Sequence, residues 1–414
     1  MVMVARHAAN RHLRDPIFEA GQACQAAIAQ HGADAVTNAT IGVVLDESGK
    51  LAVLPTMEKV YRSMDMRDLV AYAPINGLPD YLNMSIDLTF ADNKPEGYIA
   101  ATATSGGTGA VHHAIANYVE IGDAALTSDW FWGNYNVICK ETGKYLVNFK
   151  LFDKDQNFNI KDFESKMDLI LEAQDSLLVI LNTPAHNPTG FALSESDWDN
   201  VIDAVKARAA KGKKMSILVD IAYIDFAGEK NATRKFMRKF SGLPENIITL
   251  FAFSMSKSYT MYGQRTGALV AVSSSKEVID EFKETSKYSN RATWSNINRG
   301  AQALMIKLSQ DKEATAAFEK ERNDFYQLVQ KRANIFVEEA KECGLNFLPY
   351  KGGFFIAVPA ENPAAVCNKL HEDLIFAVPL KLGIRVAACS VSLDKMKGVA
   401  TKMKKAFDSL ELNQ

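Results

Sequence analysis

Short apolar runs alternate with amphipathic helical patterns over the middle of the chain, from about residue 98 to residue 272. The apolar runs have the length of buried strands, and the segments between them repeat apolar positions at helical spacing. This alternation predicts a largely parallel sheet with helices on both faces. The expected strands are Tyr98–Thr102, Ala124–Thr127, Tyr145–Phe149, Leu177–Leu181, Ser216–Asp220, Ile247–Phe253 and Thr266–Val272, and the expected helices are Gly109–Tyr118, Ile160–Glu172 and Glu195–Arg208.

The pattern changes on both sides of this region. Residues 275–342 read as nearly all helical, with an arginine-bearing break at Ser289–Ser295, and the remaining residues mix helices with short strands at Phe354–Val358, Ile375–Val378 and Ile384–Ala388. We therefore predict an α/β fold, in which a large domain with a doubly wound, mostly parallel sheet is joined to a small α+β domain. The expected division is an N-terminal segment of the small domain (1–50), a large domain (51–295), a helical connector (296–342) and the small domain proper (343–414).

Composition removes several classes of function. The 414 residues are 47% hydrophobic and carry a formal net charge of −2, which gives no electrostatic case for nucleic acid or an anionic membrane. No apolar run reaches membrane-spanning length, and the N-terminus lacks the apolar core of a signal peptide. The five cysteines have no CxxC spacing and the seven histidines form no HExxH pair. We expect reduced thiols, a cytoplasmic location and no metal site.

Lys257 lies between two of the expected strands and eight positions before Arg265, with Ser254 close by. Burial lowers the pKa of a lysine, and a neutral amine attacks a carbonyl to form a Schiff base. Hydroxyls and an arginine are the groups expected around a phosphate. An aldehyde that carries a phosphate describes pyridoxal phosphate, so this segment indicates an enzyme that uses that cofactor. The alternative is an ordinary loop lysine with its ammonium in water.

Two loops at strand ends are candidates for binding the same ligand, because open α/β sheets bind ligands at the carboxyl ends of their strands. Residues Ser105–Gly109 join a strand to a helix, where backbone N–H groups and the helix dipole bind phosphate, although a tight turn also favours glycine. Residues Asn182–Gly190 contain two prolines and a glycine, which force an irregular loop. Within it, Asn187 is placed to donate to a phenolate oxygen or to form a plain Asn-Pro turn.

Four further side chains suit a flat, charged cofactor and its substrate. Asp220 ends a buried strand, where its carboxylate needs a cation such as a protonated pyridine nitrogen, unless it caps a turn. Tyr223 is placed to donate to the phenolic oxygen, and Trp132 to stack on the ring, although aromatic clusters are more often core. Arg385 ends a short strand and suits a carboxylate, or else a surface ion pair.

Taken together, these residues resemble the fold-type I pyridoxal phosphate enzymes, and specifically the class I aminotransferases near the aspartate/aromatic branch. The resemblance covers nearly the whole chain. The matching positions, in order, are Gly42, Tyr72, Gly106-Gly107-Thr108, Trp132, Asn187-Pro188-Thr189-Gly190, Asp220, Tyr223, Ser254, Lys257, Arg265, Arg291 and Arg385. The separations of 33 from Asn187 to Asp220 and 37 onward to Lys257 also match that family.

The resemblance implies a role for each position around the cofactor ring. Lys257 would hold pyridoxal phosphate as a Schiff base and then shuttle a proton, while Asp220 pairs with the pyridine nitrogen. Tyr223 and Asn187 would hold the phenolic oxygen. Trp132 would stack on the ring, and both Trp132 and Asn187 would also contact the substrate.

The same resemblance implies a phosphate site and a second subunit. The phosphate-binding positions would be Gly106, Gly107, Thr108, Ser254 and Arg265. Tyr72 would reach this site from the other subunit of a homodimer and count among the catalytic residues. Arg385 would grip the α-carboxylate of an amino acid or 2-oxo acid, with the backbone of Gly42 close by.

Arg291 bears on the choice of substrate. In the aspartate branch the matching arginine crosses the dimer interface to a side-chain carboxylate, which would favour aspartate, glutamate and 2-oxoglutarate. Two departures stand beside it, since Trp294 replaces a usual tyrosine and Ile297-Asn298-Arg299 replaces a loop with two prolines. Aromatic aminotransferases of this branch keep the same arginine, so dicarboxylic and aromatic amino acids both remain open.

The resemblance also leaves alternatives on the same fold. A lyase or decarboxylase would keep the cofactor and end in elimination or loss of carbon dioxide, although Arg291 argues against it. A ligand-sensing regulator usually carries a DNA-binding extension, and the residues before Gly42 show no evident helix-turn-helix. A nucleotide-binding dehydrogenase would need an acidic residue at a strand end to bind the ribose, and no strand in the expected place ends with one. Transamination between an amino acid and a 2-oxo acid is therefore the expected reaction.

Overall fold

The computed structural model describes residues 3–9 and 11–411. In this part of the chain a seven-stranded mixed sheet has the order β2-β8-β7-β6-β5-β3-β4. Its strands are β2 (Tyr98–Thr104), β3 (Ala124–Ser128), β4 (Tyr145–Phe149), β5 (Ser176–Asn182), β6 (Lys214–Asp220), β7 (Ile247–Ser254) and β8 (Gly267–Ser273). Only β8 runs antiparallel to its neighbours β2 and β7 within this sheet. All seven strands overlap the expected ones, and the mostly parallel α/β fold is confirmed.

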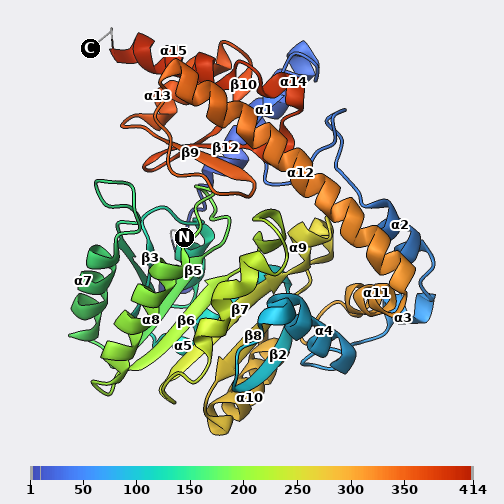
Figure 1. The fold of residues 1–414 in the computed structure, drawn as a ribbon, viewed down its shortest axis with the longest axis vertical. Helices are drawn as coiled ribbons and strands as arrows, with labels where there is room; N and C mark the ends of the chain where they lie inside the picture. Colours follow the sequence, from blue (N-terminus) through green and yellow to red (C-terminus); the bar gives the residue numbers. More distant parts are fainter. Residues whose placement is uncertain (1–2, 10, 412–414) are drawn as a thin grey trace.

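Helices cover both faces of this sheet (Figure 1). One face packs against α5 (Gly106–Tyr118), α6 (Asn134–Glu141) and α10 (Lys276–Thr293). The other packs against α4 (Pro79–Phe90), α7 (Ile160–Leu171), α8 (Glu195–Ala209) and α11 (Arg299–Gln310). The central strands β5, β6 and β7 are buried along almost their whole length because they have helices on both sides. Short helices α2 (Pro55–Arg62), α3 (Met66–Val70) and α9 (Met255–Ser258) lie between these elements.

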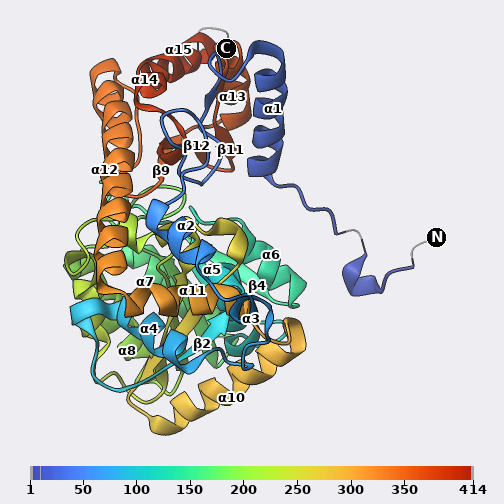
Figure 2. The ribbon, with the colours of Figure 1, turned by 90° about the vertical axis from the view of Figure 1, so that its right-hand side faces the viewer.

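A second, smaller sheet has the order β11-β12-β9, with β9 (Phe355–Pro359), β11 (Val378–Leu380) and β12 (Gly383–Ala387). It packs with α13 (Pro363–His371), α14 (Leu393–Met396) and α15 (Val399–Glu411) in one hydrophobic cluster. The N-terminal part joins it, because β1 (Thr37–Asn38) pairs in parallel with β10 (Ile375–Phe376) and α1 (Pro16–His31) contacts β10 and β11. The long helix α12 (Lys312–Cys343) runs from the large sheet to this layer (Figures 1 and 2).

Two local predictions were wrong. The expected strand Ile375–Val378 is split into β10 and β11, because the first half pairs with β1 and the second with β12. The expected break at Ser289–Ser295 begins later, since α10 continues through Thr293 and therefore contains Arg291. The predicted domain boundaries stay a prediction. No helix among the described residues is both long and apolar enough to span a membrane.

Candidate active site

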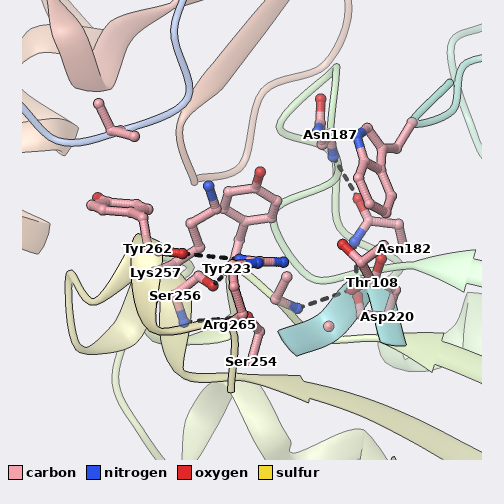
Figure 3. A pocket seen from close by; sticks show the side chains of 14 residues that line it. Thr108, Asn182, Asn187, Asp220, Tyr223, Ser254, Ser256, Lys257, Tyr262 and Arg265 are labelled. Carbon is pink, nitrogen blue, oxygen red and sulfur yellow. Dashed lines mark hydrogen bonds between the residues drawn. The ribbon is translucent and has the colours of Figure 1, made fainter. Parts of the chain in front are cut away.

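The carboxyl ends of β2, β5, β6 and β7 open into one cavity of about 290 Å³ (Figure 3). Strand order explains the convergence, because the parallel strands β5, β6 and β7 are neighbours and end at the same edge of the sheet. Residues far apart in the chain therefore share one pocket. Its lining includes Val43, Gly107, Thr108, Trp132, Asn182, Asn187, Asp220, Tyr223, Ser254, Lys257, Tyr262 and Arg265.

Lys257 presents its amine to this cavity from the short helix α9, which directly follows β7. Its Nζ donates to the backbone carbonyl of Gly42 at 2.8 Å and lies 4.9 Å from the ring centroid of Tyr262. Burial lowers the pKa of Lys257 to about 8, with Arg385 and Arg265 acting in the same direction. About a tenth of the amine is therefore neutral and nucleophilic at pH 7, far more than for an unperturbed lysine.

Asp220 ends β6 and is 5% exposed. Its Oδ2 accepts a hydrogen bond from the Tyr135 hydroxyl at 2.6 Å, and its Oδ1 accepts from the backbone N–H of Ala222 at 3.2 Å. Burial raises the pKa of this carboxyl, and these hydrogen bonds oppose the shift. Within the described residues Asp220 has no cationic partner at salt-bridge distance. A buried carboxylate that lines a pocket in this way fits a ligand with a protonated ring nitrogen.

A phosphate-sized cradle lies at the start of α5. Gly106 has a φ of +68°, and a Cβ there would meet Arg265 Nη2 at 2.9 Å. A Cβ on Gly107 would lie 3.2 Å from Ser254 Cβ. The N-cap residue Ser105 makes no side-chain capping bond, so the first N–H groups of the helix are open to an anion. Arg265 donates to the backbone carbonyl of Tyr262 at 2.9 Å and forms no salt bridge within the described chain.

Arg385 lies beside the cavity on β12 and is 3% exposed. Its Nη2 donates to Thr40 O at 2.7 Å, and its Nη1 donates to Asn187 Oδ1 at 3.4 Å. The guanidinium lies 4.3 Å from the ring centroid of Phe355, and its Nε has no hydrogen-bond partner in the described structure. A buried guanidinium whose described hydrogen-bond partners are neutral and whose Nε keeps a free donor fits a carboxylate ligand.

The other residues predicted to contact a cofactor ring, Asn187, Tyr223 and Trp132, also line the cavity. The loop that carries Asn187 is held by Asn182, whose Oδ1 accepts from the Asn187 backbone N–H at 2.6 Å. This loop has cis peptide bonds at Thr183-Pro184 and Asn187-Pro188. Tyr223 packs edge-on against Phe354 and Phe355, and the half-buried Trp132 packs edge-on against Tyr135 at 5.6 Å. Both aromatic residues contribute to the pocket wall.

Two predicted site residues lie away from this cavity in the single chain. Tyr72 is 87% exposed and is not part of the lining. Arg291 is exposed on the last turn of α10, where its Nη1 donates to Ser295 Oγ at 2.6 Å. The neighbouring Trp294 packs on His113, with ring centroids 5.1 Å apart. Neither Tyr72 nor Arg291 is positioned by its own chain to touch a ligand beside Lys257.

The sequence analysis gave no role to three residues that hold the pocket wall in place. Tyr135 holds Asp220, Asn182 holds the loop of Asn187, and Tyr262 accepts from the backbone N–H of Val44 at 2.9 Å. Tyr135 is three positions after Trp132 and Tyr262 is five after Lys257, so both lie in segments that the sequence singled out. Their proximity to a recognised site residue was the available signal, but sequence separation does not show where a hydroxyl points.

The fold and this pocket define a class of protein, the pyridoxal-phosphate-dependent transferases. Residues 34–402 match the family model for aminotransferase class I and II, and the chain belongs to this family. The resemblance drawn from the sequence is thereby confirmed.

Named relatives agree with this assignment. The aspartate aminotransferase of Salmonella typhi is 27% identical over 329 residues, which cover 77% of this chain and 81% of that protein. A crystal structure of an aminotransferase from Anaerococcus prevotii is 40% identical, covers 99% of both chains and has a TM-score of 0.95. An aromatic-amino-acid aminotransferase from Burkholderia pseudomallei, solved covalently bound to pyridoxal phosphate, shares the fold at 22% identity, with a TM-score of 0.79 over 97% of this chain and 100% of that one.

The protein is therefore an enzyme of the transaminase class, and the lyase and sensor alternatives are not favoured. The family match supports pyridoxal phosphate as its cofactor, in agreement with the fit of the cradle, the buried carboxylate and the lysine amine. Small amino and 2-oxo acids are the substrates of such an enzyme.

Proposed function

We propose that the cavity around Lys257 catalyses amino-group transfer from an L-amino acid to 2-oxoglutarate in two half-reactions. The observation that carries this proposal is the Lys257 amine, which is desolvated, held at Gly42 O and lies in one cavity with Asp220. Bound pyridoxal phosphate supplies an aldehyde for attachment and a conjugated ring that accepts electrons. The protein supplies orientation, exclusion of water and proton transfer.

The residues around the cavity divide this work. Lys257 binds the cofactor covalently, and its amine then carries the proton that leaves the substrate α-carbon. Asp220 keeps a protonated ring nitrogen in place, while Tyr223 and Asn187 hold the ring oxygen. Gly106, Gly107, Thr108, Ser254 and Arg265 bind the phosphate, and Trp132 lies against the ring.

Arg385 orients the substrate in this scheme. Its buried guanidinium has a free Nε and is fixed by Thr40 and Asn187, so a substrate α-carboxylate finds donors already in position. The loop of Thr40 and Gly42 accepts hydrogen bonds from both Arg385 and the amine of Lys257. An α-amino acid held by its carboxylate thus places its amino group near the reacting lysine.

We further propose that the working enzyme is a homodimer, in which Tyr72 and Arg291 of one protomer complete the site of the other. The support is their position, because both are exposed and lie away from the cavity of their own chain. Met66 and Val70 on α3, just before Tyr72 in the chain, are also exposed and add apolar surface that a second copy would cover. Residues 11–14, which are all exposed, also extend away from the rest of the chain (Figure 2). Light scattering on the purified protein tests the mass, and a monomer would contradict this proposal.

The choice of amino donor depends on that dimer. With Arg291 entering from a second copy, a second cation would bind a side-chain carboxylate, so aspartate and glutamate are the proposed donors, as the names of the curated relatives support. The second candidate is an aromatic amino acid. It is favoured by the cavity wall of Val43, Trp132 and Tyr262, to which the described chain adds no second cation aimed at a side chain.

The direct test combines protein, pyridoxal phosphate, aspartate and 2-oxoglutarate. Formation of glutamate and oxaloacetate is expected, with phenylalanine assayed in parallel as the aromatic donor. Absence of amino transfer from every donor to every 2-oxo acid would refute the proposal.

We also propose a cytoplasmic location, which the unpaired state of all five cysteines supports. Cell fractionation would contradict it by finding the protein outside the cytoplasm.

A further inference from the structure

Tyr135 makes the shortest hydrogen bond to the carboxylate of Asp220 among the described residues, across 85 positions of sequence. Its side chain is fully buried, and its hydroxyl donates to Asp220 Oδ2 at 2.6 Å. The tyrosine lies in the first turn of α6, and its backbone N–H donates to Trp132 O at 3.0 Å. The turn that places Trp132 in the cavity wall therefore also places the Tyr135 hydroxyl against the carboxylate of Asp220.

The ring of Tyr135 is fixed by its surroundings. Trp132 packs edge-on against it at an interplanar angle of 83°, and Tyr135 is a buried member of the apolar cluster between α5, α6 and the sheet. A clamped ring leaves the hydroxyl one direction, which is toward the carboxylate.

An ionised carboxylate accepts about four hydrogen bonds. Tyr135 and the N–H of Ala222 occupy one position on each oxygen of Asp220, from the protein side. Asp220 also lines the cavity, so its remaining acceptor positions lie on the pocket side. A carboxylate without these two donors would be free to turn or to take up a proton, because burial disfavours its charge.

We propose that Tyr135 is a positioning residue, whose hydroxyl holds Asp220 ionised and turned so that it can pair with the ring nitrogen of the cofactor. This inference rests on the proposed function, because it assigns the ring nitrogen as the group that Asp220 meets. Tyr135 itself does not touch the cofactor nitrogen, and its effect is transmitted through the carboxylate. The alternative is a core tyrosine that has only satisfied its hydroxyl on a nearby acceptor.

The test compares two ligands that differ only at the ring nitrogen. The apo form of the full chain is titrated with pyridoxal phosphate and with its analogue in which a C–H group replaces that nitrogen, and both dissociation constants are measured by equilibrium dialysis. The ratio of the two dissociation constants measures how much the ring nitrogen adds to the binding affinity. In Tyr135→Phe this preference should fall about tenfold, the size expected for one charge-assisted hydrogen bond. In the Asp220→Asn background the same change should leave the ratio unaltered.

Tyr81→Phe is the matched control. Tyr81 is also fully buried, and its hydroxyl donates to Gly267 O at 2.8 Å rather than to Asp220. It should change the binding of both ligands equally and leave the ratio at the wild-type value. Both dissociation constants of a ratio are measured on the same variant. A partial loss of folded protein therefore affects both equally and does not change their ratio. A ratio in Tyr135→Phe equal to that of wild type, or an equal fall in Tyr81→Phe, would overturn the inference. Failure of wild type to bind either ligand would instead refute the proposed function.

Discussion

The amine of Lys257 donates a hydrogen bond to the backbone carbonyl of Gly42, 215 residues away in the chain, at 2.8 Å. The acceptor belongs to the loop that follows β1, and β1 pairs with β10 beside the small sheet, whereas Lys257 follows β7 of the large sheet. Arg385 repeats the same relationship, because it donates to Thr40 O in that loop. The N-terminal loop thus connects the amine of Lys257 with the guanidinium of Arg385.

Gly42→Ala should damage this connection. A Cβ at residue 42 would lie 2.8 Å from Phe355 Cζ, so either the ring or the loop must move. Because Phe355 also packs under the guanidinium of Arg385, we expect a rise in KM and a fall in kcat, on the order of tenfold or more in kcat/KM. Steady-state kinetics provides the measurement. Gly21→Ala in α1 is the control, since its Cβ would meet only Thr40 Oγ1 at 4.0 Å, and comparable damage there would contradict the argument.

Lys257→Ala should abolish covalent attachment of the cofactor and lower the rate of transamination on the order of 10⁴-fold, because no other amine lines the cavity described here. Borohydride reduction followed by mass spectrometry detects the attachment. Lys230→Ala, which removes an exposed lysine paired with Glu319, should leave it intact. Retained attachment in Lys257→Ala would assign the reactive amine elsewhere.

The pH dependence of cofactor attachment should report the lowered pKa of Lys257. Burial favours the neutral amine and brings its pKa from 10.5 to about 8, so the protonated, unreactive form predominates only below that value. The rate of attachment of pyridoxal phosphate to the apoenzyme should rise with pH up to about 8 and level off above it. Stopped-flow absorbance follows the reaction, and a rate that continues to climb toward pH 10 would mean an unperturbed amine.

Arg291→Ala distinguishes the two classes of amino donor. If this exposed arginine enters the site of a second protomer and binds a side-chain carboxylate, the variant should lose kcat/KM for aspartate by about 10²-fold or more, and much less for phenylalanine. A screen of both donors with 2-oxoglutarate makes the comparison. Arg62→Ala, which removes an exposed arginine paired with Glu58 on its own helix, serves as the control. Equal losses for both donors would leave Arg291 with a structural role.

Asp225→Asn should destabilise the fold. Asp225 accepts from Arg234 at 2.7 Å and lies 3.5 Å from Arg322 of α12, and all three side chains are largely buried. Removing the charge leaves two buried cations without their partner, which costs about 3–5 kcal/mol in the free energy of unfolding. Urea unfolding measures it. Asp199→Asn breaks an exposed pair with Lys239 and should cost less than about 1 kcal/mol.

The cluster of Asp225, Arg234 and Arg322 should also make the stability of the fold depend on pH. Burial alone would raise the pKa of Asp225, but Arg322 and Arg234 outweigh it and hold that pKa well below 3.8. A lowered carboxyl pKa contributes stability above the unfolded value, and this stability is lost as pH falls below it. The wild type should therefore lose stability below about pH 4 more steeply than Asp225→Asn. Parallel slopes for the two proteins would contradict this account.

Sequence periodicity predicted the strands of the large sheet well, because burial by helices on both faces makes the central strands β5, β6 and β7 continuous apolar runs. It separated β10 from β11 poorly, since Ile375–Leu380 is one extended stretch whose division depends on which strand lies beside each half. Arg291 was assigned to a loop for a related reason. The polar end of an exposed helix has the same composition as a loop, and the helix ends only where the backbone N–H of Trp294 bonds to Asn290 O.

The sequence by itself determined the order of the strands along the chain and the residues that follow them, because periodicity, glycine and proline act over a few positions. It therefore placed Lys257, Asp220, Asn187 and the glycines of α5 at strand ends. Only the tertiary structure decided which of these ends meet, and which hydroxyl or carbonyl completes them. The bonds from Tyr135 to Asp220 and from Lys257 to Gly42 join residues 85 and 215 positions apart. Such bonds depend on the lateral order of strands and the packing of two sheets, and no local pattern encodes either to within the reach of a hydrogen bond.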